Sequence, residues 1–76
     1  MGNKLDYIAK NIKSLRVRSG LSQEDVANKL GIRRESYLGY EANPLKVKLK
    51  IYYELSKIFN CDLREFFLEH NVTKSD

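Results

Sequence analysis

Apolar residues recur at alternating three- and four-residue spacings along most of this chain, and this pattern limits the fold more than any other feature. In the first segment the spacing places apolar side chains on one face, as in an amphipathic helix: Leu5, Ile8, Ile12 and Leu15. Gly20 follows where a left-handed residue commonly ends a helix. Comparable patterns predict four more short helices, over about residues 22–30, 33–41, 47–59 and 63–69.

The second helix has recognisable end signals. Ser22 is a good N-cap, and Asp25 three residues later makes a weak version of the capping box. Gly31 is expected to stop the helix after about two turns. Its predicted buried side consists of Val26, Ala27 and Leu30.

The remaining helices are predicted from their apolar positions and caps. The third uses Ile32, Tyr37 and Tyr40, and residues 42–44 read as a loop. The fourth carries a stripe with two aromatic residues beside it, namely Ile51, Leu55 and Ile58 with Tyr52 and Phe59. Asn60 is a plausible cap for this helix, and Asp62 is the expected N-cap of the last one.

One stretch, residues 44–51, alternates apolar residues with lysines and could form a strand on pattern alone. We reject that interpretation because the rest of the sequence offers no pairing strand, and an isolated strand is unstable. The predicted fold is therefore all-α, a compact five-helix domain. We expect one domain over residues 1–76, with an ordered core at about 4–70 and a frayed tail at about 71–76.

Composition excludes several classes of site. Cys61 and His70 are the only residues of their types among 76, so neither an intrachain disulfide nor a four-ligand zinc site can form. We expect no metal, cofactor or small-molecule ligand. Charged residues near the start and the lack of a long apolar run predict an intracellular, cytoplasmic protein. A net charge of +4 permits a polyanionic partner without proving one.

The stretch from Gln23 to Glu41 carries the strongest functional signal. It predicts two helices joined by a short glycine-containing turn, which is the helix-turn-helix unit. Ala27 lies where the helices should cross, and Gly31 provides the turn conformation that residues with a Cβ adopt at a cost. Such a unit presents its second helix as a rigid body to the DNA major groove.

The run from Leu21 to Ile32 closely resembles the opening of the Cro/repressor-type helix-turn-helix family, also called the XRE or lambda-repressor-like family. Residues 12–16 fit its first helix, and residues 40–41 and 55–67 resemble its later helices. The resemblance covers about residues 5–68 and implies a five-helix DNA-binding domain with the helix-turn-helix at helices two and three.

The resemblance also implies roles for individual positions. Ser22 and Gln23, at the start of the second helix, correspond to contacts with the DNA backbone. The recognition helix is expected to read bases from its exposed opening, through Arg33, Arg34, Glu35 and Ser36, with Gly39 one turn further on. Three cations are then placed to neutralise phosphates: Arg16, Lys46 and Lys48.

Three positions depart from the family pattern. Ala42 and Asn43 follow Glu41 where many members have Asn-Gly, so the usual backbone contact of that Asn is in question. Gly39 replaces a larger residue that often reaches a base. Pro44 and Leu45 make the next loop less polar than usual.

Two groups of aromatic residues leave alternatives open. Tyr37 and Tyr40 fit the core, although Tyr37 could instead direct its hydroxyl to a phosphate. Adjacent helical residues point about 100° apart, so Phe66 and Phe67 cannot both enter the same core site. We expect one of the two to pack inside and the other to form a dimer surface with Leu68.

The predicted function is sequence-specific DNA binding for transcriptional control. The chain is expected to be a small repressor or Cro-like switch protein of a phage, plasmid or other mobile element, binding a palindromic operator as a homodimer. An antitoxin or antirepressor-like protein-interaction module on the same scaffold is the alternative, and a regulatory protein partner is possible. An enzyme is not expected, because no nucleophile–base–acid set or phosphate-binding glycine loop is present.

Overall fold

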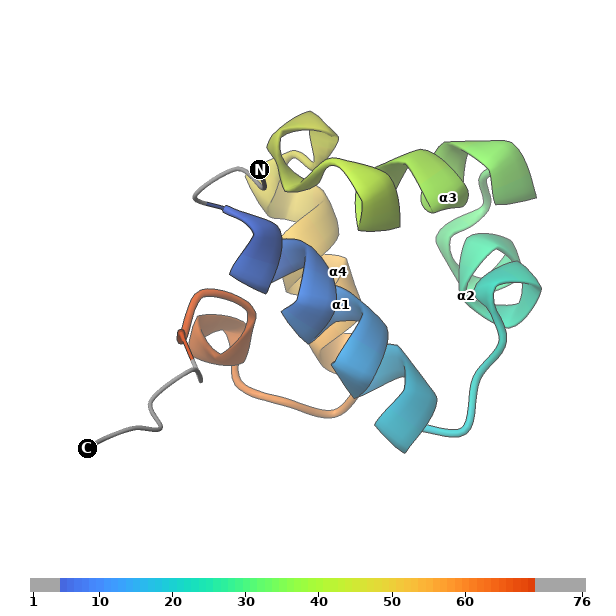
Figure 1. The fold of residues 1–76 in the computed structure, drawn as a ribbon. Helices are drawn as coiled ribbons and strands as arrows, with labels where there is room; N and C mark the ends of the chain where they lie inside the picture. Colours follow the sequence, from blue (N-terminus) through green and yellow to red (C-terminus); the bar gives the residue numbers. More distant parts are fainter. Residues whose placement is uncertain (1–4, 70–76) are drawn as a thin grey trace.

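The described part of the chain is entirely helical. The computed structural model describes residues 5–69, and within that range it contains four α-helices, two 3-10 helices and no strand (Figure 1). In chain order the elements are α1 (Asp6–Arg18), α2 (Gln23–Leu30), α3 (Arg34–Ala42), η1 (Pro44–Lys46), α4 (Leu49–Ile58) and η2 (Leu63–Phe66). The all-α prediction is confirmed, while His70 and the expected frayed tail lie outside the described residues.

Helix α1 crosses the middle of the molecule and contacts α3, η1 and η2 (Figure 1). The predicted stripe is confirmed, because Ile8, Ile12 and Leu15 are buried on one face of the helix. Leu5 is half-buried just before the first helical residue. Gly20 has the predicted left-handed conformation, with φ of 75°.

The start of α2 and the turn after it form as their end signals predict. Ser22 Oγ accepts the Asp25 amide at 3.0 Å, and Asp25 Oδ2 accepts the Ser22 amide at 2.9 Å, so the capping box is complete. Gly31 ends the helix with φ of 72°. Helix α3 then packs on α2 and is anchored in the core by Tyr37, which is fully buried.

The segment before α4 differs from its prediction. The helix begins at Leu49 rather than at about residue 47, because Val47 and Lys48 are extended and Val47 is buried. The core side of α4 is also rotated: Ile51 and Ile58 are only half-buried. The buried positions are instead Tyr52, Leu55, Ser56 and Phe59.

The predicted fifth α-helix is not present among the described residues, and a single 3-10 helix of four residues, η2, takes its place. Asp62 caps η2 as predicted by accepting the Arg64 amide at 2.8 Å. The side-chain amide of Asn11 in α1 donates to the carbonyls of Phe66 at 2.9 Å and Leu68 at 2.7 Å. These carbonyls are bonded to α1 rather than to later amides of their own segment, which is one reason why no longer helix forms.

The core lies between α1, α3, α4 and η2. Phe66 from η2 is fully buried and its ring lies 5.5 Å from that of Tyr52 and 6.2 Å from that of Phe59, centroid to centroid. All the helices therefore contribute to one apolar cluster, which holds α2 and α3 in a fixed orientation. Its fully packed members are Ile8, Ile12, Leu15, Val26, Ala27, Tyr37, Val47, Tyr52, Leu55, Phe59 and Phe66.

Candidate nucleic-acid interface

Helix α3 presents its opening turn to the outside of the molecule. Arg33 is the extended N-cap, with φ of −73° and ψ of 151°, so the helix begins at Arg34, within a residue of the predicted start. The four residues expected to read bases, Arg33, Arg34, Glu35 and Ser36, are all exposed. On the opposite side of the helix Tyr37 is fully buried. The helix thus has one anchored face and one free face.

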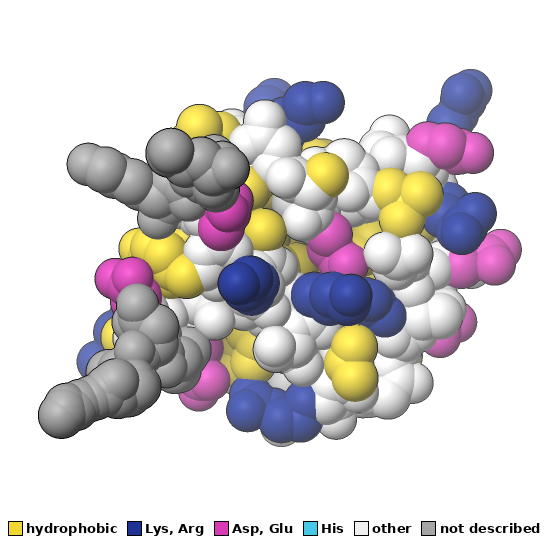
Figure 2. All heavy atoms as spheres, in the orientation of Figure 1, with side chains coloured by type: hydrophobic (Ala, Val, Ile, Leu, Met, Phe, Trp, Pro, Cys, Tyr) yellow, Lys and Arg dark blue, Asp and Glu magenta, His cyan; other side chains and the backbone are white. Residues whose placement is uncertain are grey.

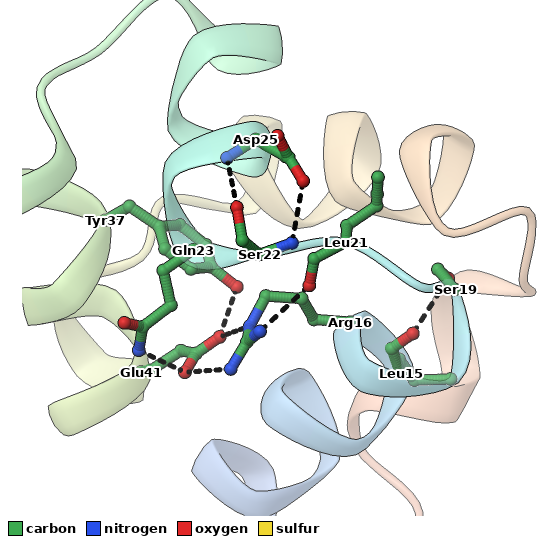
Figure 3. Close-up of polar contacts among 9 residues, drawn as sticks. All are labelled: Leu15, Arg16, Ser19, Leu21, Ser22, Gln23, Asp25, Tyr37 and Glu41. Atoms are coloured by element: carbon green, nitrogen blue, oxygen red, sulfur yellow. Dashed lines mark hydrogen bonds and ion pairs between the residues drawn. The ribbon is translucent and has the colours of Figure 1, made fainter.

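A buried ion pair fixes α3 against α1 (Figure 3). Arg16 Nε donates to Glu41 Oε2 at 2.7 Å, and the two side chains are only 10% and 7% exposed. The Arg16 Nη1 group donates to the carbonyl of Leu21 at 2.9 Å, which ties the same guanidinium to the segment leading into α2. One side chain therefore connects α1, the start of the helix-turn-helix and the end of α3.

Glu41 collects two further hydrogen bonds. The Tyr37 hydroxyl donates to Glu41 Oε2 at 2.5 Å, and Gln23 Nε2 donates to Oε1 at 3.1 Å (Figure 3). Burial on its own would raise the pKa of the Glu41 carboxyl, but the hydrogen bonds from Arg16, Tyr37 and Gln23 together hold that pKa below its ordinary value. Burial is also the main reason why the pKa of the Tyr37 hydroxyl is raised.

This network changes what several predicted residues do in the structure. Arg16, expected on a phosphate, has its guanidinium in the buried ion pair instead. Tyr37 belongs to the core, and its hydroxyl is bonded to Glu41 rather than directed outward. The sequence prediction gave Glu41 no role beyond ending the recognition helix. The signal available was a buried-side carboxylate that needs a cation, since unpaired buried charges are strongly unfavourable.

Gln23 and Ser22 lie at the start of α2, where the prediction places DNA-backbone contacts. Gln23 is the first residue of the helix and is half-buried, with its amide nitrogen directed to Glu41. Ser22 is exposed, and its hydroxyl oxygen accepts the Asp25 amide. The hydroxyl hydrogen of Ser22 is not used in that bond, so it is available to an acceptor such as a phosphate oxygen.

The lysines after α3 lie on a segment held by buried contacts. Lys46 and Lys48 are exposed on either side of buried Val47. The Tyr52 hydroxyl donates to the buried carbonyl of Pro44 at 2.9 Å, and burial raises the pKa of Tyr52 to about 12. Asn43 Oδ1 accepts the Leu45 amide at 3.1 Å, so this Asn caps η1.

The three residues predicted for a dimer surface are divided by the fold. Phe66 is fully buried and has no surface to offer a partner. Phe67 and Leu68 are 38% and 50% exposed, and the Phe67 ring lies 4.9 Å from that of Tyr52. The alternative in which one Phe packs inside and the other faces outward is the arrangement found, with Phe66 inside.

Charge on the described surface is mixed rather than uniformly basic. Figure 2 shows cationic and acidic side chains together at the end of the molecule where α2 lies and α3 begins. Glu24, Asp25 and Glu35 are exposed in the same region as Arg33 and Arg34. Within residues 5–69 no group of His, Cys, Asp or Glu side chains could hold a metal ion. None of the described helices has the length and apolar character needed to cross a bilayer.

Comparison with known proteins agrees with this architecture. The family model described as helix-turn-helix matches residues 12–66. An uncharacterized HTH-type transcriptional regulator of Archaeoglobus fulgidus is 30% identical over 57 residues, covering 75% of this chain and 81% of that protein. A second such regulator, from Methanocaldococcus jannaschii, is 31% identical over 68 residues, or 90% and 92% of the two chains.

A viral relative is also similar. The cryptic phage CTXphi transcriptional repressor RstR of Vibrio cholerae is 37% identical over 54 residues, which cover 71% of this chain and 49% of the repressor. No solved structure gives a significant match. The family match spans both helices of the motif together with the core that supports them. This chain belongs to the XRE-type helix-turn-helix family of DNA-binding transcriptional regulators.

Proposed function

We propose that this protein is a small repressor or Cro-like switch protein that binds a palindromic operator as a homodimer, with α3 in the major groove. One observation carries the proposal. The opening of α3 is exposed, while the opposite side of the helix is fixed by the buried Arg16–Glu41 pair. A rigid helix with a free polar face is what reading base edges requires.

The exposed residues have the chemistry for this task. Arg33 and Arg34 can each donate two hydrogen bonds to a guanine, and Glu35 can accept from a cytosine. Ser36 can donate to either kind of acceptor. Gln23 and Ser22 would contact the DNA backbone from the start of α2, and Lys46 and Lys48 would neutralise phosphates beside it. Arg16 acts here as a positioning residue, because its guanidinium is bonded within the protein.

Dimerisation is proposed through Phe67 and Leu68. Both are partly exposed apolar residues next to η2. A two-fold dimer would present two copies of α3 to half-sites about one DNA turn apart. Such a protein would act in the cytoplasm at the nucleoid.

Fluorescence anisotropy tests the proposal directly. Labelled duplexes tiled across the region upstream of its own gene are titrated at about 150 mM salt, which is close to physiological ionic strength. We expect one duplex to bind at least about 10³-fold more tightly than its scrambled counterpart. Arg34→Ala should weaken that duplex by roughly 1–3 kcal/mol. Lys29→Ala removes the same charge from the exposed part of α2 and should have a much smaller effect. Equal affinity for all duplexes contradicts the proposal.

A protein-interaction module is the second candidate, and one observation favours it. Leu45 and Leu49 are 71% and 68% exposed, which is unusual for leucines with no apolar neighbour in DNA backbone to cover them. If the protein is an antitoxin or antirepressor-like module, Arg34→Ala should leave partner binding intact and Leu45→Ser should abolish it.

A further inference from the structure

Gly39 lies inside α3, yet the described protein gives no reason for a glycine there. Its φ is not positive, unlike those of Gly20 and Gly31, so the helical backbone at this position suits any residue. A Cβ built on Gly39 would meet no atom within 4 Å. Neither the backbone conformation nor the packing therefore excludes a side chain.

A glycine in this position works against the stability of the domain. Glycine is a poorer residue than alanine in a helix interior because it loses more conformational freedom on folding. Since nothing inside the protein compensates, the reason for Gly39 is to be sought in what contacts α3 from outside.

The position of Gly39 on the helix identifies that contact. It follows Glu35 by four residues and therefore shares its face, and it points away from the buried side marked by Tyr37. This face is the one assigned above to the DNA. Glycine also serves elsewhere where a backbone must come close to a ligand.

We propose that Gly39 is the point where DNA comes nearest to α3, and that its missing side chain sets how deeply the helix enters the groove. The inference rests on the proposed function and deepens it. A methyl group at Gly39 would extend about 1.5 Å from the helix backbone, roughly one bond length. It would hold the helix away from the DNA and weaken the reach of Arg34 and Glu35 to the bases.

The size of the side chain is therefore the variable to test, at constant charge. A duplex is first enriched from a random 20-bp library (an arbitrary length of about two turns of DNA) with the wild-type protein. Its affinity is then measured for wild type, Gly39→Ala and Gly39→Leu. Asn28→Leu is the control, because it adds similar bulk at an exposed position of α2 outside the proposed interface.

We expect Gly39→Ala to weaken the enriched duplex at least about tenfold, and Gly39→Leu to weaken it further, while both variants unfold at higher urea than wild type. Because no charge changes, the slope of log affinity against log salt should remain that of wild type. Asn28→Leu should bind like wild type. Gly39→Ala binding within twofold of wild type overturns this inference alone, whereas failure of the wild type to enrich any duplex overturns the proposed function and the inference with it.

Discussion

Arg16 and Glu41 form a buried ion pair that links the last turn of the first helix to the last turn of the helix that begins at Arg34. Their closest atoms, Nε and Oε2, are 2.7 Å apart. Gln23, at the start of α2, donates to the other oxygen of the same carboxylate. Three helices thus meet at one carboxylate, so the stability of the fold and the orientation of α3 depend on the same group.

Replacing Arg16 with methionine should destabilise the protein strongly. Methionine fills a similar volume but leaves the Glu41 carboxylate buried without its cation, and breaking a buried pair in this way typically costs about 3–5 kcal/mol. Urea unfolding of the wild type and Arg16→Met measures the loss. The double variant Arg16→Met with Glu41→Gln should recover part of it, because no unpaired charge remains. A loss below about 1 kcal/mol for Arg16→Met, as for a surface pair, contradicts this account.

The same carboxylate predicts how stability depends on pH. The folded-state pKa of Glu41 lies below its ordinary value of 4.5, so its stabilisation is present above that pH and is lost as the pH falls through the folded-state value. Urea midpoints measured from pH 7 into acid should therefore fall more steeply for the wild type than for Glu41→Gln. The two curves should converge in acid.

Two exposed carboxylates add a common background to both curves. The pKa of Asp25 is lowered by the backbone amide of Ser22, and that of Asp62 by the side chain of Arg64. Both groups are present in the wild type and in Glu41→Gln, so the difference between the curves isolates Glu41. Parallel curves across the acid range would show that Glu41 has no depressed pKa in the folded state.

Local signals in the sequence predicted local structure well. The ends of α2 followed from Ser22, Asp25 and Gly31, since caps and left-handed turns depend on residues only a few positions apart. The core stripe of α1 followed from its spacing for the same reason. These features together were enough to identify the helix-turn-helix and the start of its recognition helix.

Features that depend on distant contacts were predicted less well. The fifth α-helix was replaced by η2, whose carbonyls are bonded to Asn11, more than fifty residues earlier in the chain. Arg16 was assigned to a phosphate because its partner Glu41 is 25 residues away in sequence. No periodic pattern reports that such a pair will meet, so the positioning part of the site became visible only in the folded structure.

Gly31→Ala should destabilise the fold through the backbone alone. The residue has φ of 72° and a Cβ there would meet no atom within 4 Å, so the penalty comes from the left-handed conformation rather than from a clash. We expect a loss of about 1–2 kcal/mol in urea unfolding. Gly31→Asn should lose less, because Asn tolerates this region better than Ala. Equal losses for the two variants would point to a cause other than backbone conformation.

Gln23→Ala should separate DNA binding from stability. Gln23 supplies only one of the hydrogen bonds to Glu41, which keeps those from Arg16 and Tyr37. We therefore expect a loss of about 0.5–1.5 kcal/mol in stability but a larger relative loss of affinity for the enriched duplex. Anisotropy and urea unfolding of the same preparation measure both. Unchanged affinity would remove Gln23 from the proposed interface.

Leu68→Ser should weaken dimerisation while leaving the fold intact. Leu68 is 50% exposed, so the substitution removes little core packing, but it takes apolar area from the proposed dimer surface. Sedimentation velocity should show the wild type shifting from dimer to monomer only on dilution, and Leu68→Ser remaining monomeric at higher concentration. Phe66→Ala is the contrasting variant: this fully buried residue should lose about 3–5 kcal/mol of stability at any concentration. If Leu68→Ser dimerises as the wild type does, the dimer surface lies elsewhere, because a half-exposed apolar residue at a real interface cannot become polar without weakening it.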